Sequence, residues 1–189
     1  MPDSDQRGVS LLEIIVVIAL IGIVVGLVKP NLNSWKANAT VKSDFNQLVA
    51  TIEYLKSKAR AVNGTAVLIC NKSAKTITYA ISSTVYSSVS TVPAAFSASE
   101  TVENTGANIL SGKSTPSSTT GFCNSASRGI FLGSGQVGLE GGAVQLDMEI
   151  NFNNDKVNYD AYRVVVYQTT GFLQKQRWNK STSGWVDFE

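Results

Sequence analysis

The sequence predicts an α+β fold in which one long N-terminal helix packs on an antiparallel β-sheet. Three observations carry this prediction. Residues 9–28 are apolar apart from a few small residues and contain one ionisable side chain, Glu13. Residues 35–62 repeat apolar side chains at steps of three and four, which is the spacing of one helix face. Residues 64–189 contain short apolar or alternating segments separated by turn residues, as strands do, so they form a β-rich head.

The composition argues against catalysis and against binding of nucleic acid through bulk charge. The chain has 189 residues, a formal net charge of +2 and no histidine. Histidine is the commonest general base and metal ligand, and so small a charge surplus gives little attraction for phosphate. The sequence contains no nucleophile elbow, no Walker-type loop and no cluster of metal ligands. We therefore predict a protein that is not an enzyme and uses no cofactor and no metal.

The apolar segment of residues 9–28 is long enough to cross a bilayer. In a helix its 20 residues span roughly 30 Å, the thickness of the hydrocarbon core. A cleaved secretory signal ending near Ala39 is the weaker alternative, because its apolar core would be too long and its start contains Asp3 and Asp5. A carboxylate within lipid is costly, so Glu13 is a candidate functional residue; the alternative is a side chain that reaches the nearby membrane surface.

Residues 7–13, Arg-Gly-Val-Ser-Leu-Leu-Glu, and the apolar run after them resemble the prepilin N-terminus of type IV pilins and type II secretion pseudopilins. The resemblance implies a pilin-like fold and a leader peptide, which prepilin peptidase removes by cutting between Gly8 and Val9, with N-methylation of Val9. It also implies that Glu13 pairs with the N-terminal amine of a neighbouring subunit, which neutralises two charges in an apolar filament core. The sequence departs from the family at Val9, where phenylalanine is usual, and in its acidic leader.

The resemblance also implies a domain organisation, partners and a location. Residues 1–8 are the leader, 9–28 the transmembrane and filament-core helix, 29–63 an amphipathic helix packed on the head, and 64–189 the periplasmic head. The expected partners are other pilins or pseudopilins, bound through the N-terminal helix, and the prepilin peptidase. The chain is expected to be a single-pass protein of the inner membrane that later enters a pilus or pseudopilus.

The amphipathic helix of residues 29–63 is the element that joins the apolar segment to the head. Asn63 and Gly64 are a natural stop, since glycine is favoured just past a helix end. Pro30 predicts a bend near the start of this helix. The basic residues near its end are spread around the helix, so we expect a solvated helix end rather than a binding site; they are Lys56, Lys58 and Arg60.

The head is expected to contain a series of strands, at residues 65–70, 76–81, 129–132, 144–152, 162–169 and 172–178. The first two form a hairpin, and Gly171 marks the turn of the last one. Residues 82–127, rich in Ser, Thr, Ala and Gly, are either a loop with short strands of its own or a functional surface. Asp147 and Glu149 share a strand face, and we expect them to be exposed rather than to hold a cation.

Cys70 and Cys123 are the only cysteines. An even pair downstream of a membrane segment is typical of an exported head with a disulfide bond. The alternative is two unrelated buried thiols. A bond between them would close a long loop and, in the chain-entropy account, stabilise the head by about 4 kcal/mol.

Two short blocks of the head narrow the functional prediction. Residues 55–64, which run into an apolar strand, and residues 162–171 resemble minor pilins of the FimU/FimT type and the minor pseudopilin GspH. The resemblance implies a minor type IV pilin in the initiating or tip complex of a pilus, which serves adhesion, twitching motility or DNA uptake. The alternative is a minor pseudopilin of a type II secretion system.

A third alternative is a pilin that binds DNA for natural transformation. Some FimT-like proteins are thought to bind DNA through basic residues near the C-terminal strand, where this chain has Lys175, Arg177 and Lys180. Such cations hold phosphates, and the interspersed Trp178 and Trp185 offer rings on which bases stack. The family's arginine-rich motif after the glycine is not present, so we expect a solvated strand face rather than a DNA site.

Overall fold

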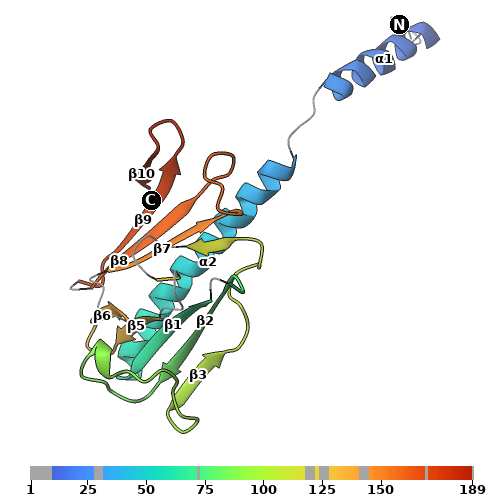
Figure 1. Cartoon of the computed structure of the whole chain (residues 1–189). Coiled ribbons are helices and arrows are strands. Elements are labelled where there is room, and N and C mark those ends of the chain that lie inside the picture. Colours follow the sequence, from blue (N-terminus) through green and yellow to red (C-terminus); the bar gives the residue numbers. More distant parts are fainter. Residues whose placement is uncertain are drawn as a thin grey trace, which may run out of the picture. The chain divides into compact units, whose positions relative to one another are not determined.

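The computed structural model describes residues 10–27, 32–71, 73–117, 122–123, 128–140, 145–168 and 170–188. The chain forms two compact units, Met1–Asn33 and Ser34–Glu189. The first unit contains helix α1, Leu11–Leu27. The second is the head, which is built on helix α2, Leu32–Ala61, and two β-sheets (Figure 1). This is the predicted α+β arrangement of a long N-terminal helix followed by antiparallel sheets.

Helix α2 has one buried side, which faces the sheets. Its buried apolar residues recur at three- and four-residue steps and are Ala37, Val41, Phe45, Leu48, Ile52, Leu55 and Ala59. The helix ends where Asn63 adopts a left-handed conformation, with φ of 45°, and where the Gly64 N–H donates to the Ala59 carbonyl at 2.9 Å. A Cβ atom on Gly64 would lie 2.0 Å from the Ser82 carbonyl oxygen, so only glycine fits there. The predicted stop is confirmed, whereas the predicted bend at Pro30 lies outside the described residues.

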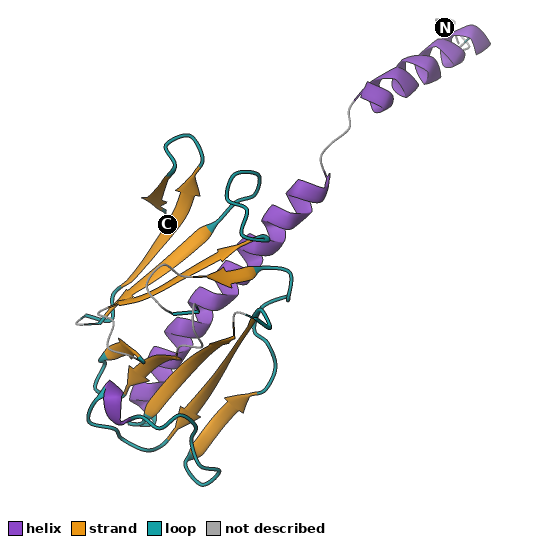
Figure 2. Cartoon of the chain, in the orientation of Figure 1, coloured by secondary structure: helices purple, strands orange, loops and turns teal. Residues whose placement is uncertain are grey.

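The head contains two five-stranded antiparallel sheets, where the sequence led us to expect one (Figure 2). The first has the order β3-β2-β1-β5-β6, with β1 Thr65–Asn71, β2 Thr76–Ser82, β3 Thr101–Thr105, β5 Arg128–Leu132 and β6 Val137–Leu139. The second has the order β10-β9-β8-β7-β4, with β4 Thr115–Ser117, β7 Gln145–Asn151, β8 Tyr162–Tyr167, β9 Leu173–Asn179 and β10 Gly184–Asp187. The predicted hairpin is confirmed by the pairing of β1 with β2.

The six predicted strands correspond to β1, β2, β5, β7, β8 and β9. The sequence reading missed β3, β4, β6 and β10, each of three to five residues. Within residues 82–127 the structure places β3, β4 and a short 3-10 helix, η1 Val89–Thr91. Of the two interpretations offered for that segment, a loop with short strands of its own is the one that describes its backbone.

One apolar core joins α2 to both sheets. It includes Leu48 and Ile52 of α2, Leu68 of β1, Phe131 of β5 and Val164 of β8, each at most 1% exposed. Near the middle of α2, three aromatic rings meet. Phe45 stacks on Tyr162 with ring centroids 5.2 Å apart and contacts Phe188 at 5.8 Å. Both sheets are therefore fixed to the same helix.

A smaller cluster covers the other face of the first sheet. Val67 of β1 and Ile130 of β5 are cross-strand neighbours there, and Val92 packs on them from the Ser/Thr-rich segment. Tyr86 and Phe96 of that segment stack at 6.3 Å beside the cluster. This part of the segment thus forms a lid of packed residues over the sheet.

Arg128 ties the lid to the first sheet. Its guanidinium bonds Glu140 through two nitrogens, Nε at 3.1 Å and NH2 at 2.9 Å, and its NH1 also donates to the Pro93 carbonyl. The Arg128 side chain is 11% exposed and that of Glu140 is 45% exposed, so the guanidinium is buried while the carboxylate still meets water. The same contact lowers the pKa of the Glu140 carboxyl, chiefly through the hydrogen bond from Arg128.

We expect Arg128→Ala to destabilise the head by about 1–3 kcal/mol, because the Pro93 carbonyl loses its donor and Glu140 its partner. Urea unfolding measures the loss, and hydrogen exchange should show faster opening across residues 84–100. Lys113→Ala, which removes an exposed cation, is the matched control and should change little. Equal stability of the two variants would contradict the role given to Arg128.

The disulfide bond between Cys70 and Cys123 is present, as predicted. Their Cα atoms lie 5.2 Å apart, and the two residues are 53 positions apart in the sequence. Both are at most 1% exposed and belong to the main core. The bond therefore fixes the end of β1 to a residue near the end of the Ser/Thr-rich segment.

Candidate functional site

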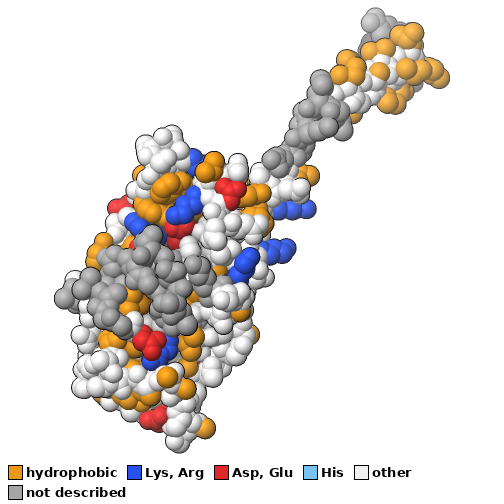
Figure 3. Space-filling model, in the orientation of Figure 1, with side chains coloured by type: hydrophobic (Ala, Val, Ile, Leu, Met, Phe, Trp, Pro, Cys, Tyr) orange, Lys and Arg blue, Asp and Glu red, His pale blue; other side chains and the backbone are white. Residues whose placement is uncertain are grey.

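Helix α1 is the first candidate site, because it is apolar on all sides. Its sequence contains one ionisable residue, Glu13, in the first turn. The N–H of Glu13 donates to the Ser10 carbonyl at 2.9 Å, and a carboxylate in this turn is favoured by the helix dipole. Every described side chain from Leu11 to Ile23 is exposed, Leu11 to 77% and Ile18 to 64% (Figure 3). A helix of this kind is stable only when other molecules cover it.

The two processing residues, Gly8 and Val9, lie outside the described residues. Among the residues that the structure describes, no helix is both long enough and apolar enough to cross a membrane.

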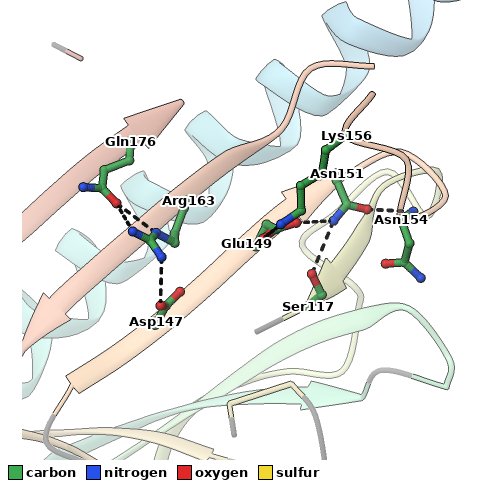
Figure 4. A network of polar contacts seen from close by, with 8 residues as sticks. All are labelled: Ser117, Asp147, Glu149, Asn151, Asn154, Lys156, Arg163 and Gln176. Atoms are coloured by element: carbon green, nitrogen blue, oxygen red, sulfur yellow. Dashed lines mark hydrogen bonds and ion pairs between the residues drawn. The ribbon is translucent and has the colours of Figure 1, made fainter. Parts of the chain in front are cut away.

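A polar network on the second sheet is the other candidate site (Figure 4). Leu146, Met148 and Ile150 of β7 enter the core, so the alternate residues lie on the opposite face of the strand. Asp147 and Glu149 were expected to be exposed, and this expectation is wrong: they are 2% and 3% exposed. Neighbouring side chains cover them, which the alternation of β7 alone does not reveal.

Glu149 is the centre of one half of the network. The Lys156 ammonium lies 2.5 Å from its Oε2, and the Asn151 side-chain amide donates to its Oε1 at 2.7 Å. The same Lys156 nitrogen lies over two indole rings, 5.1 Å from the centroid of Trp178 and 5.0 Å from that of Trp185. The carboxylate and the two rings together form a cation-binding pocket that the chain fills with its own lysine.

Asp147 and Arg163 form the other half. Arg163 NH1 lies 3.5 Å from Asp147 Oδ2, while its Nε donates to Gln176 at 2.8 Å and its guanidinium lies 4.7 Å from the centre of the Trp185 ring. Asp147 Oδ1 is buried without a hydrogen-bond partner among the described residues. Burial raises the pKa of the Asp147 carboxyl, and the attraction of Arg163 offsets this only in part.

Sequence reasoning missed Lys156 and Arg163, because nothing near them in the sequence marks them as a pair of cations. Arg163 lies beside Glu149 in the register of β8 and β7, and Lys156 comes from the turn between these strands. The network joins that turn, β4, β7, β8 and the β9–β10 hairpin. Within the described ranges, no group of three acidic or cysteine side chains could hold a metal ion. The arrangement cross-links the turn between β7 and β8 to the second sheet.

We predict that Asp147→Asn changes how the stability of the head depends on pH. A carboxyl whose folded pKa is raised contributes most below its unfolded pKa of 3.8, and this contribution is lost as pH rises through the folded value. The parent should therefore gain stability relative to Asp147→Asn when pH is lowered from neutral toward 3.8. Urea unfolding of both proteins across this range measures the difference. A difference that stays constant with pH would contradict the prediction.

The three basic residues proposed for DNA do not form one patch. Lys175 and Arg177 are cross-strand neighbours of Val164 and Tyr162, which enter the core, so they lie on the helix side of β9. Trp178 lies on the opposite face of the strand. Lys180 pairs with Asp160, at 3.4 Å, and donates to the Asn158 carbonyl at 3.3 Å. A phosphate held by the basic pair would therefore not place its base on the tryptophans.

The basic end of α2 differs from the solvated helix end that the sequence suggested. Lys56 is half-buried and donates to the Gly171 carbonyl, which fixes the β8–β9 turn to the helix. Burial, together with the nearby Arg60 guanidinium, lowers the pKa of the Lys56 amine. Arg60 itself is exposed and lies over Gly135 in the β5–β6 turn.

Comparison with known proteins places the N-terminal segment in a class. Residues 3–28 match the family described as the prokaryotic N-terminal methylation motif. No curated protein and no solved structure matches the chain. The chain therefore carries a prepilin N-terminus of the type IV pilin-like kind.

This match supports a type IV pilin or pseudopilin in general. It implies a substrate of prepilin peptidase that assembles with other pilins, and it suggests membrane anchoring and assembly into a surface filament. The matched residues include Gly8, Val9 and Glu13, on which the sequence-based prediction rests.

Proposed function

We propose that this protein is a minor type IV pilin, a subunit of the initiating or tip complex of a type IV pilus. One observation carries the proposal: α1, apolar on every described side and bearing a single carboxylate, lies within the methylation motif and precedes a head with its own core. Such a chain offers one helix for assembly into a filament and one folded domain for contacts with neighbouring subunits. The role proposed is assembly, not catalysis.

The minor-pilin part of the proposal rests on the two FimU/FimT/GspH-like blocks. Residues 55–64 form the end of α2 and lead into β1, and residues 162–171 form β8 and the turn after it. The two blocks meet where Lys56 donates to the Gly171 carbonyl. This contact gives both blocks the same structural role, which is to dock the second sheet on α2.

A minor pseudopilin of a type II secretion system remains the second candidate, because the same helix and head serve both filaments. We do not extend the proposal to DNA binding, since Lys175 and Arg177 lie on the face of β9 opposite Trp178 and Lys180 is paired with Asp160.

Mass spectrometry of the mature protein, purified from membranes of the source cell, tests the processing step. We expect a chain that has lost residues 1–8 and carries a methylated Val9. A Gly8→Val variant should keep its leader and serves as the control. A mature parent that retains the leader, or begins near Ala39, would contradict the assignment.

A deletion strain separates the two filaments. For a minor pilin we expect loss of surface pili and of twitching, both restored by the parent gene, with secretion of folded exoproteins unchanged. Immunogold labelling of sheared filaments should place the head at one filament end. Loss of secretion with normal piliation would instead indicate that the protein is a pseudopilin.

A further inference from the structure

Trp35 is exposed in a way that the fold of the head does not explain. It lies at the end of the first turn of α2, and 69% of it is exposed. The other two tryptophans, Trp178 and Trp185, are half-buried and contact each other and Lys156. A tryptophan combines a large apolar surface with one N–H donor, so it is most stable where one end is apolar and the other wet.

The side of α2 that bears Trp35 faces away from the head. Nearby buried residues are Ala37, Val41 and Phe45. At 3.6 residues per turn, Trp35 and Lys36 lie on the opposite side of the helix from these. Both are exposed, and so is Lys42. An apolar ring and two ammonium groups thus share the outer surface of the first three turns of α2.

The stretch of α2 that bears these cations has no acid of its own, and an acid that the fold brings beside it, Asp160, whose N–H donates to Asn38 Oδ1 at 2.9 Å, is already paired with Lys180. Residues 32–43 contain Lys36 and Lys42 but no Asp or Glu, and the next acid, Asp44, is 5% exposed and bonds Ser111. Lys and Arg side chains are visible along this part of α2 (Figure 3). The surface therefore suits a negatively charged partner that also offers an apolar boundary.

The sequence distance to the apolar segment indicates which partner this is. Trp35 follows Val28 by seven residues and Glu13 by 22. Seven residues of chain span at most about 25 Å even when fully extended, so Trp35 is tethered close to the end of the apolar segment. If the apolar segment crosses the hydrocarbon core, as the proposed function holds, the lipid headgroups begin where that segment ends. Tryptophan is enriched at this level of membranes, and lysine is attracted to anionic lipid.

We propose that Trp35, Lys36 and Lys42 form a membrane-interface anchor that contacts anionic lipid headgroups before the subunit enters a filament. The ring lies at the boundary of headgroups and acyl chains, and the two ammonium groups pair with lipid phosphates. This inference rests on the membrane anchoring included in the proposed function. It adds a second membrane contact, made by the head itself.

The test uses the full-length precursor in nanodiscs of phosphatidylcholine and phosphatidylglycerol, with lipids brominated either near the glycerol end or near the methyl end of the acyl chain. Bromine quenches tryptophan emission only at close range. The emission of Trp35 is the difference between the parent and Trp35→Phe. We expect most of this emission to be lost with the shallow bromine and little with the deep one. Trp185→Phe is the matched control, since Trp185 lies in the head and its emission should be unaffected by either label.

Insertion is measured separately by resistance of the precursor to alkaline extraction from membranes. An inserted precursor whose Trp35 emission is unaffected by shallow bromine would overturn this inference and leave the proposed function standing. A precursor that does not insert would overturn both. The cations are tested by Lys36→Gln/Lys42→Gln, for which the quenching should no longer depend on phosphatidylglycerol; unchanged dependence would refute their role.

Discussion

Glu13→Gln is expected to abolish incorporation of the protein into filaments while leaving the head folded. In the proposed assembly the Glu13 carboxylate neutralises the N-terminal amine of a neighbouring subunit. An amine left unpaired in an apolar filament core costs about 3–5 kcal/mol, which corresponds to a loss of roughly a hundred- to several thousandfold in subunit addition. The Glu13 side chain is exposed on α1, and α1 belongs to a compact unit separate from the head, so we expect the stability of the head to be unchanged.

The measurement is the amount of protein in the sheared filament fraction relative to the membrane fraction. Glu53→Gln is a suitable control, because it removes an equally exposed carboxylate from α2. Cleavage of the leader should be checked in both variants, so that a failure to process is not read as a failure to assemble. Equal filament content of the parent and Glu13→Gln would refute the role of the carboxylate.

Removing the disulfide bond is the second large effect. For a loop closed between residues 53 positions apart, Cys70→Ser/Cys123→Ser should lower the free energy of unfolding by about 4 kcal/mol. Both sulfur atoms lie in the main core, so two buried hydroxyls add a further cost to the loss of the cross-link. Urea unfolding of the parent and the variant, each at neutral pH, measures the combined loss in the free energy of unfolding.

A reducing agent provides the control for this prediction. It should destabilise the parent by a comparable amount and leave the double variant unchanged, because the variant has no bond to reduce. Such a dependence is expected of a head that is exported to an oxidising compartment, as the proposed function implies. A parent that is equally stable in the reduced and the oxidised form would show that the cross-link does not stabilise the head.

Residues 55–82 show how far local pattern carries a prediction. The apolar stripe of α2, the stop at Asn63 and Gly64, and the β1–β2 hairpin are all confirmed, because each depends on neighbours within a few residues. The burial of Asp147 and the hydrogen bond of Lys56 depend on segments far away in the sequence. Asp147 is covered by Arg163, and Lys56 binds the Gly171 carbonyl, 115 positions further on.

The local sequence pattern also does not predict that the strands divide into two sheets. Alternation in β7 and β8 indicates which side chains share a face, but not that β4 pairs with β7 while β6 stays with β5. The short strands β3, β4, β6 and β10 have too few residues to show a period. They exist because longer neighbours supply their hydrogen-bond partners.

The prepilin N-terminus is what the sequence determined by itself. Gly8, Glu13 and the apolar run act through their order along the chain, so no tertiary contact is needed to recognise them, and the family match covers the same residues. The tertiary structure alone decided which polar groups of the head are free. It buried Asp147 and Glu149, paired Lys156 and Lys180, and left Trp35 uncovered. Exposure depends on what long-range packing brings over a side chain, and that information is spread across the whole fold.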